Sequence, residues 1–417
     1  MPDTELTRVA RDRTLLFIGR AIRMFAYGFL AVVLGLYLME RGHSPTWIGF
    51  LITMTLLGDT VISLWLTTAA DRFGRRKTLL IGAGLMLLAS IVFAMTGNSL
   101  LLVLAATIGV ISPSGYEVGP FLAVEQASLS HVVAGDKRTS VFAWYNLVGT
   151  LATAVGALAA GHLAYQLQLR DVSALNSYRC IVIGYGILGL LMAGVFAMLS
   201  PHVEVKTAQA KPGTLLGLHK SRGVIFKLSS FFAIDAFGGG FVVMTFLSMW
   251  FKTKYPTTTD AWLGNIFFGA NVLAALSALS ASWLARRIGL INTMVFTHLP
   301  SNVLLMLVPF MPTVQLAVIL LWVRYSISQM DVPTRQSYTM AVVDPDERSA
   351  AAGVTGVARS IGAMLAPSLA GKLLANPATM SSIFFIGGGM KIIYDILLYR
   401  SFTAVKPPEE ASVQIQK

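Results

Sequence analysis

Thirteen ionisable side chains lie inside long apolar runs of this 417-residue sequence. Each costs about 2.5–3.5 kcal/mol at the centre of a membrane-spanning helix, so each needs a partner or water. Such residues are the first candidates for binding a charged solute or carrying a proton, because a carboxylate held away from water favours its protonated form. The thirteen are Arg20, Arg23, Asp59, Glu117, Glu125, Asp235, Arg324, Asp331, Arg335, Arg359, Lys372, Lys391 and Asp395.

The apolar runs that hold these residues have the length of membrane-spanning helices. The sequence is 55% hydrophobic and 12% charged, whereas soluble domains are about 25% charged. Runs of about 20 apolar residues are long enough to cross a bilayer. The fourth run should break near Pro113 or Pro120. We predict helices over residues 14–39, 46–70, 78–95, 100–132, 139–165, 178–199, 225–251, 262–285, 290–310, 313–343, 349–374 and 380–402.

The two halves of the sequence repeat at a nearly constant offset. Glu125-Gln126 and Arg335-Gln336 align at an offset of 210, and Gly161 aligns with Gly371 at the same offset. Internal repeats of this kind are typical of secondary transporters. We predict an N-terminal bundle over residues 1–200, a cytoplasmic linker over 201–224, a C-terminal bundle over 225–404 and a cytoplasmic tail over 405–417.

A short basic turn, residues 71–77, separates the second and third runs and carries four cations. Lys and Arg in short loops favour the cytoplasmic side. This Asp-Arg-x-Gly-Arg-Arg-Lys turn resembles the signature loop of the major facilitator superfamily of transporters, and the chain is loosely similar to their drug–proton antiporters. The resemblance implies twelve transmembrane helices in two pseudo-symmetric six-helix bundles.

The resemblance also implies a conformational switch in this loop, with its acid near the N-terminal end of helix 11 when the cytoplasmic side is closed. The second copy of the loop, residues 286–289, lacks the acid, so the switch should belong mainly to the first half. The residues of the predicted switch are Asp71, Arg72, Gly74, Arg75, Arg76 and Lys77.

In the resembled family helices 1, 4, 7 and 10 line a central cavity, and the repeat sorts four charges on them. Arg23 is equivalent to Asp235, and Glu125 is equivalent to Arg335. Each lies seven to ten residues from the predicted cytoplasmic end of its helix. We therefore predict the pairs Arg23–Glu125 and Asp235–Arg335. Either these pairs only hold each half together, or a solute or proton competes for one of them.

Asp59 and Arg359 form a third predicted pair, each ten or eleven residues from the cytoplasmic edge. Helices 2 and 11 meet across the two halves in the resembled family, so this contact would form and break as the halves rock. The alternative is an ordinary polar residue facing a water-filled crevice. Lys391 and Asp395 are spaced i, i+4 on one helix, which favours a local pair.

Three charges lie near the middle of their helices, where a solute or a proton would bind: Glu117, Arg324 and Asp331. Tyr116 is the neighbour of Glu117, and Tyr27 could form part of an aromatic cavity wall. The alternative for Glu117 is a partner in helix packing, and most aromatic residues at helical spacing are packing residues or interface anchors.

The net charge of +12 has a topological explanation. Of the 32 Lys and Arg residues, 20 lie in predicted cytoplasmic segments and 5 in predicted external loops. This asymmetry places both termini in the cytoplasm, and it argues against nucleic acid as a partner. The lipid bilayer of the cell membrane is the expected surrounding of a multi-pass monomer.

Nothing in the sequence suggests an enzyme, a metal site or a cofactor, because the six histidines lack ligand spacing and Cys180 is the single cysteine. The predicted function is secondary active transport of a small solute by alternating access, coupled to protons, with export favoured over uptake. Two antiporter motifs of helices 4 and 5 have no clear match. A nutrient uptake permease and a non-transporting membrane sensor on the same fold remain alternatives.

Overall fold

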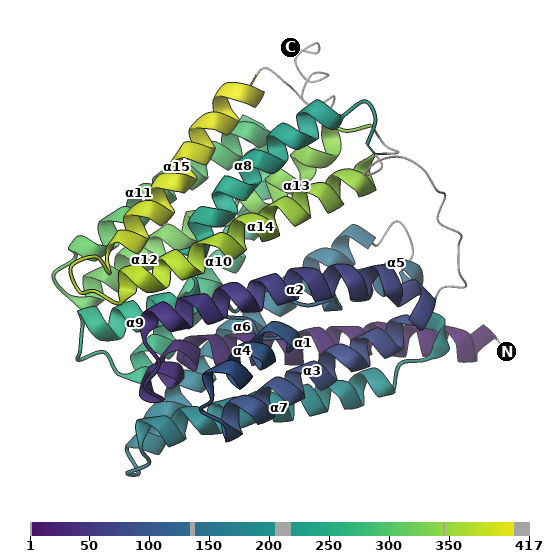
Figure 1. The fold of residues 1–417 in the computed structure, drawn as a ribbon. Helices are drawn as coiled ribbons and strands as arrows, with labels where there is room; N and C mark the ends of the chain where they lie inside the picture. The colour runs from purple at the N-terminus through teal and green to yellow at the C-terminus, as the bar shows by residue number, and fades with distance from the viewer. Residues whose placement is uncertain (1, 134–137, 205–217, 345–346, 404–417) are drawn as a thin grey trace. The chain divides into compact units, whose positions relative to one another are not determined.

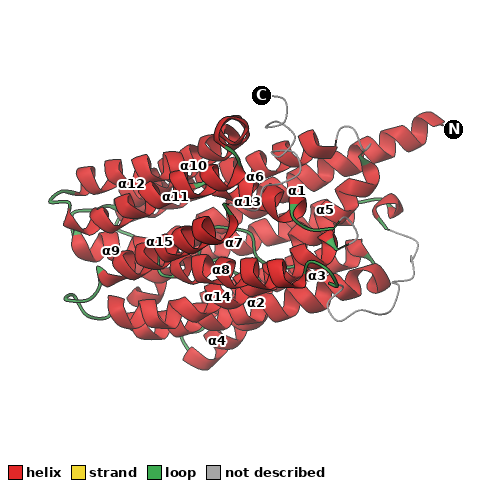
Figure 2. Cartoon of the chain, turned by 90° about the horizontal axis from the view of Figure 1, so that it is seen from above, coloured by secondary structure: helices red, strands yellow, loops and turns green. Residues whose placement is uncertain are grey.

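The computed structural model describes residues 2–133, 138–204, 218–344 and 347–403, with only the backbone given for 2–9, 66–73, 130–132, 138–140, 202 and 349. Every regular element in these residues is a helix (Figure 2). The α-helices are α1 (Pro2–Glu40), α2 (Pro45–Phe73), α3 (Arg75–Met95), α4 (Ser99–Ile108), α5 (Phe121–Val132), α6 (Arg138–Gln168), α7 (Ala174–Ala197), α8 (Arg222–Gly240), α9 (Met244–Lys254), α10 (Asp260–Ile288), α11 (Leu290–Leu307), α12 (Val314–Ser328), α13 (Asp331–Ala341), α14 (Arg348–Leu374) and α15 (Ser382–Phe402).

Nine spans within the described residues are long and apolar enough to cross a membrane. They match nine of the twelve predicted helices. The fourth and tenth predicted helices are each divided in two, as α4 with α5 and α12 with α13, and the eleventh corresponds to α14. The sequence therefore predicted the order of the apolar segments, and the structure adds where they are interrupted.

The fourth predicted helix breaks at its prolines, as expected, but the interruption is a loop over residues 109–120. Pro113 has no backbone N–H to donate, and Gly115 and Gly119 have φ angles of +74° and +82°. Residues that carry a side chain rarely adopt such left-handed backbone angles, so glycine suits both positions. Non-helical backbone at membrane depth is tolerated where it is buried in protein or lines a water-filled cavity.

The prediction of one continuous helix was wrong for the seventh and tenth segments. The run Gly238-Gly239-Gly240 ends α8, because glycine has low helix propensity, and α9 begins at Met244. In the tenth segment the N–H of Gln329 donates to Ser277 Oγ at 3.2 Å instead of continuing the helix. Pro333 in the first turn of α13 has no N–H for the carbonyl of residue 329.

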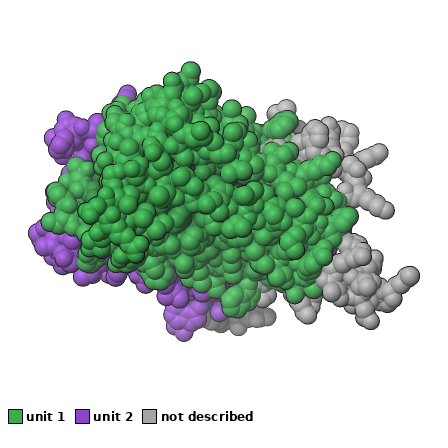
Figure 3. All heavy atoms as spheres, turned by 90° about the horizontal axis from the view of Figure 1, so that it is seen from below, with its two compact units in different colours: residues 1–209, 243–268 green, residues 210–242, 269–417 purple. Residues whose placement is uncertain are grey.

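The chain forms two compact units (Figure 3): Met1–Gln209 with Val243–Phe268, and Ala210–Val242 with Gly269–Lys417. In the first unit α1 packs against α6, α7 and α9, and in the second α8 packs against α14 and α15 (Figure 1). A Cβ on Gly28 would lie 2.1 Å from the Thr153 carbonyl oxygen, and one on Gly362 would lie 2.2 Å from that of Ala233. Glycine thus lets both central helix pairs approach backbone to backbone.

Candidate functional site: two buried charge clusters

The first unit holds a cluster centred on Arg23 of α1. Its Nη1 and Nη2 contact the two carboxylate oxygens of Glu125 on α5 at 2.5 and 2.6 Å, and Tyr145 of α6 donates its hydroxyl to the same carboxylate. Arg23, Glu125 and Tyr145 are completely buried. A two-point contact of this kind fixes both planar groups. The structure therefore brings together the pair Arg23–Glu125 that the repeat predicted.

Glu117 belongs to the same cluster, because the loop 109–120 carries its carboxylate to α1. Arg23 Nε donates to Glu117 Oε1 at 2.8 Å, and Arg20 forms an ion pair with the other oxygen. The Glu117 side chain keeps 15% of its surface exposed, whereas that of Glu125 keeps none. Glu117 is thus the carboxylate of this cluster nearest to solvent.

Two predicted tyrosines have different surroundings. The buried hydroxyl of Tyr27 donates to the Val118 carbonyl oxygen at 3.0 Å, so α1 also holds the loop through this bond. Tyr116 leaves 47% of its surface exposed, and its backbone carbonyl accepts a bond from Ser112 Oγ at 2.7 Å. Tyr27 therefore supports the cluster, while the exposed Tyr116 stands in the supporting loop.

Asp59 of α2 also holds the C-terminal end of this loop. Its Oδ1 accepts hydrogen bonds from the Gly119 N–H and, at 3.1 Å, from the Ser63 hydroxyl. Within the described part of the chain no cation contacts this carboxylate. The predicted partner, Arg359, lies in the other unit and donates to Asp235 at 3.3 Å. The pair Asp59–Arg359 stays a prediction.

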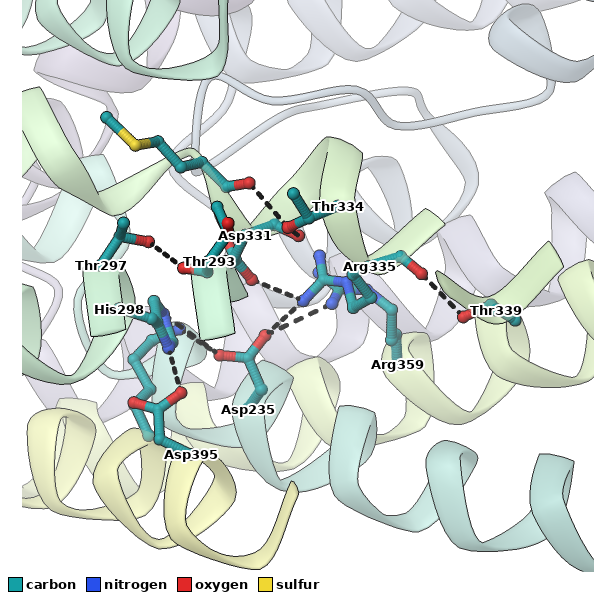
Figure 4. A network of polar contacts seen from close by, with 12 residues as sticks. Asp235, Thr293, Thr297, His298, Asp331, Thr334, Arg335, Thr339, Arg359 and Asp395 are labelled. Carbon is teal, nitrogen blue, oxygen red and sulfur yellow. Dashed lines mark hydrogen bonds and ion pairs between the residues drawn. The ribbon is translucent and has the colours of Figure 1, made fainter. Parts of the chain in front are cut away.

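The second unit has a network centred on an acid, Asp235 of α8 (Figure 4). Its Oδ2 contacts Nη1 of Arg335 and Nη1 of Arg359 at 3.1 and 3.3 Å. Its Oδ1 contacts Lys391 Nζ of α15 at 2.6 Å. His298 Nε2 of α11 lies 3.8 Å from Oδ1. The structure thus brings together the predicted pair Asp235–Arg335 and adds two more cations to it.

His298 connects Asp235 to a second acid, Asp395 of α15 (Figure 4). His298 Nδ1 lies 2.9 Å from Asp395 Oδ1, and Asn302 Nδ2 donates to Asp395 Oδ2 at 3.2 Å. The local pair predicted between Lys391 and Asp395 is replaced by these contacts. Sequence reasoning missed His298 because it counted charged residues in apolar runs, and a histidine inside residues 290–310 was the available signal.

The two candidates of the tenth segment lie on either side of its break. Asp331, at the start of α13, accepts from Arg335 Nη1 at 3.1 Å and so joins the network of the second unit. Arg324 of α12 is buried, with 6% of its surface exposed. Its guanidinium carbon lies 4.7 Å from the centre of the Tyr325 ring, and it has neither ion pair nor hydrogen bond to any residue that the structure describes.

The basic loop is held by an acid that sequence reasoning missed, Glu204, which follows α7. Its Oε2 accepts from the Arg75 N–H at 2.7 Å and its Oε1 from the Arg76 N–H at 3.1 Å, at the N-terminus of α3. Gly74, with φ of +100°, makes the turn, and Lys77 is exposed. The side chains of Asp71 and Arg72 lie outside the described residues.

A second carboxylate, Glu347, binds the backbone of the segment that leads into α8. Glu347 accepts from the backbone N–H groups of His219, of Lys220 at 3.0 Å and of Ser221 at 2.9 Å. Burial raises the pKa of Glu347, but the hydrogen bonds from Ser221 and His219 outweigh burial and lower it to about 2. Each unit therefore places a carboxylate near the N-terminal, positive end of a helix: Glu204 on the first N–H groups of α3 and Glu347 on the residues just before α8.

Buried charge clusters on interrupted membrane-spanning helices define the class of protein, a helical membrane transporter. Residues 16–330 match the family described as Major Facilitator Superfamily, and the chain belongs to this family. It is a multi-pass membrane protein and a secondary transporter of small solutes, not an enzyme. The predictions of the family and of its all-helical membrane fold are confirmed.

Relatives of known sequence or structure agree with this assignment. The chain is 27% identical over 427 residues to the "Uncharacterized membrane protein YJR124C" of Saccharomyces cerevisiae, covering 95% of both chains. Its fold is similar to the nucleoside transporter NupG (15% identity, 94% and 100% coverage, TM-score 0.73). It is also similar to a D-xylose–proton symporter (14% identity, 94% and 98% coverage, TM-score 0.72). At these identities the solved structures support the fold alone.

Proposed function

We propose that this transporter couples solute movement to protons and that Asp59 carries the proton. The observation behind the proposal is the contact set of Asp59: two hydrogen-bond donors and, among the described residues, no cation. A charged carboxylate without a counter-ion is costly inside a membrane-spanning helix. Protonation removes that charge, so the neutral form is favoured whenever the site is closed to water.

The other candidate acids are less suited to this task. Glu117 and Glu125 contact arginines, Asp235 and Asp331 contact Arg335, and protonating any of them would break a buried ion pair. Breaking a buried pair costs about 3–5 kcal/mol. Asp59 accepts a proton without that cost.

A proton on Asp59 also has a route to the cluster around Arg23. Asp59 accepts from the N–H of Gly119, two residues from Glu117 in the loop 109–120. Neutralising the Asp59 carboxylate weakens this charge-assisted bond and loosens the end of the loop. Because Glu117 is carried by the same loop, its contacts with Arg20 and Arg23 change with it.

We propose export as the direction of transport, by a monomer in the cell membrane with both termini in the cytoplasm. The two predicted bundles would be the halves that rock. The loop of residues 71–77 would act as the cytoplasmic latch, supported by the bonds of Glu204 to Arg75 and Arg76.

The test uses proteoliposomes loaded with a pH-sensitive dye and supplied in turn with labelled uridine, D-xylose, lactate and benzoate. Asp59→Asn should lose accumulation driven by a pH gradient but keep solute exchange without a gradient. Ser63→Ala is the matched control, because it removes a donor to Asp59 and leaves the acid. Gradient-driven accumulation by Asp59→Asn equal to that of the wild type would contradict the proposal. Reversing the sided gradient separates export from uptake.

A further inference from the structure

We infer that Arg324 and Ser328 bind an anionic group of the transported solute, which makes that solute a carboxylate or a similarly small organic anion. The inference rests on the proposed function, since it names the solute class of the same transporter. It starts from two polar side chains on α12 that are buried and have no partner within the described residues: Arg324 Nε and Ser328 Oγ. They retain 6% and 3% of their surface.

Arg324 differs from the other four arginines among the thirteen ionisable residues of the apolar runs. Arg20, Arg23, Arg335 and Arg359 all contact carboxylates. Arg324 has no carboxylate partner among the described residues, and its guanidinium carbon lies 4.7 Å from the centre of the Tyr325 ring. A ring face attracts the positive charge of the flat guanidinium group. It accepts no hydrogen bond from the five N–H donors, because these point outward in the guanidinium plane. The donors remain available for an acceptor that the described residues do not supply.

Ser328 lies four residues after Arg324, so both side chains share one face of α12. Many serines and threonines in the described helices donate to the carbonyl four residues earlier, as Thr334 does to Met330 at 2.8 Å. Ser328 makes no such bond, and α12 ends at this residue. A guanidinium and a hydroxyl one turn apart match the two oxygens of a carboxylate.

The depth of the site favours a solute over a lipid head group. Arg324 is ten residues from the start of α12 at Val314, which corresponds to about 15 Å along the helix. That is about half of the ~30 Å hydrocarbon core. A head group stays at the membrane surface, whereas a transported solute passes the middle.

The first experiment compares the melting temperatures of ligand-free variants in phosphatidylcholine nanodiscs. A cation waiting for a solute destabilises the empty protein, so Arg324→Met should leave the melting temperature unchanged or raise it. Arg335→Met is the control and should lower it, because Asp235 and Asp331 lose a partner. A fall for Arg324→Met as large as that for Arg335→Met would overturn the inference, since it would show a structural role.

The second experiment measures stabilisation by acetate, benzoate and succinate against acetamide and benzamide, with chloride keeping the ionic strength equal. The carboxylates should stabilise the wild type and the amides should not. Arg324→Met should bind the carboxylates more than about tenfold more weakly, Ser328→Ala should bind them more weakly to a smaller degree, and Arg324→Lys should keep part of the effect. Arg287→Gln, at an exposed arginine over Trp283, should behave as the wild type.

Each remaining outcome decides the matter. Three outcomes would overturn the anion site. The amides could stabilise the wild type as much as the carboxylates do, none of these anions could stabilise the wild type, or the anions could stabilise Arg324→Met as much as the wild type. Loss of the effect on adding anionic phosphatidylglycerol assigns the site to a lipid and also overturns the inference. Carboxylate binding retained in Asp59→Asn supports it, and if that variant still accumulates solute, only the proton proposal fails.

Discussion

Each unit buries a central charged side chain and balances it with oppositely charged neighbours, and the sign of the central charge differs between the two units. In the first, one cation, Arg23, is shared by two acids, Glu117 and Glu125. In the second, the equivalent residue is an acid, Asp235, shared by three cations that come from α13, α14 and α15. The internal repeat therefore preserves the position of a buried centre of charge and the need to balance it, while the sign of that centre is free to change.

What each unit leaves unbalanced also differs. The first unit has an acid, Asp59, and the second a cation, Arg324, that lack an oppositely charged partner within the described residues. Charges that satisfy one another build a rigid scaffold, whereas those left over are available to a ligand. In our proposal the two units therefore have different roles: the first unit binds the proton and the second unit binds the solute.

Asp235→Ala is the variant for which we expect the largest effect on the stability of a charge cluster. It removes the acid shared by three cations, of which Lys391 and Arg335 are buried, so we expect a loss of about 3–5 kcal/mol in the free energy of unfolding. Denaturation of the purified protein in detergent measures this loss. Glu125→Ala removes one partner of Arg23 but leaves Glu117, so it should cost less. A larger loss for Glu125→Ala would mean that the second network is not centred on Asp235.

A charge swap sharpens the comparison. Arg23→Glu and Glu125→Arg should each abolish transport singly. The double variant should recover only part of the stability, because the new Glu faces Glu117, which the swap leaves in place. Adding Glu117→Gln should restore a further part. The melting temperatures of the four variants test this order, and full recovery by the double variant alone would show that Glu117 is energetically separate.

The smallest expected effect concerns the two capping carboxylates. The pKa of Glu347 is lowered to about 2, so its ionised form stabilises the fold above the ordinary pKa of about 4.3, and this stabilisation is lost as the pH falls toward 2. Glu347→Gln should therefore lower the melting temperature at pH 7 and converge with the wild type in acid. Glu204→Gln, at a carboxylate that accepts two backbone N–H bonds instead of three, should change it less. A difference for Glu347→Gln that does not vary with pH would contradict the cause given for the pKa.

The sequence predicted the helical membrane fold because long apolar runs have few other stable conformations. It missed two interruptions. The seventh run stays apolar through Gly238 to Gly240, and the more polar residues around Pro333 were included in one long helix with the apolar residues before them. The repeat was sufficient to predict Arg23–Glu125 and Asp235–Arg335. It was insufficient for contacts that depend on tertiary structure, because a non-helical loop has no fixed period from which to place Glu117.

The capping acids and His298 were missed for related reasons. Glu204 and Glu347 lie in polar segments where an acid is unremarkable, and their partners are backbone groups that every residue except proline carries. His298 was missed because only Asp, Glu, Lys and Arg were counted in the apolar runs. In each case the information was distributed over elements far apart in the sequence.

The long separation between Arg23 and its acids also constrains how the protein is made. Glu117 and Glu125 follow Arg23 by 94 and 102 residues, so α1 reaches the membrane before its counter-ions exist. At about 5–20 residues per second of synthesis, both buried arginines of α1 wait roughly 5–20 s. During this time α1 should remain beside the insertion machinery, shielded from lipid. Lys391 follows Asp235 by 156 residues, so Asp235 waits longer still for this partner. The buried charges of each unit can therefore pair fully only after its later helices have been synthesised.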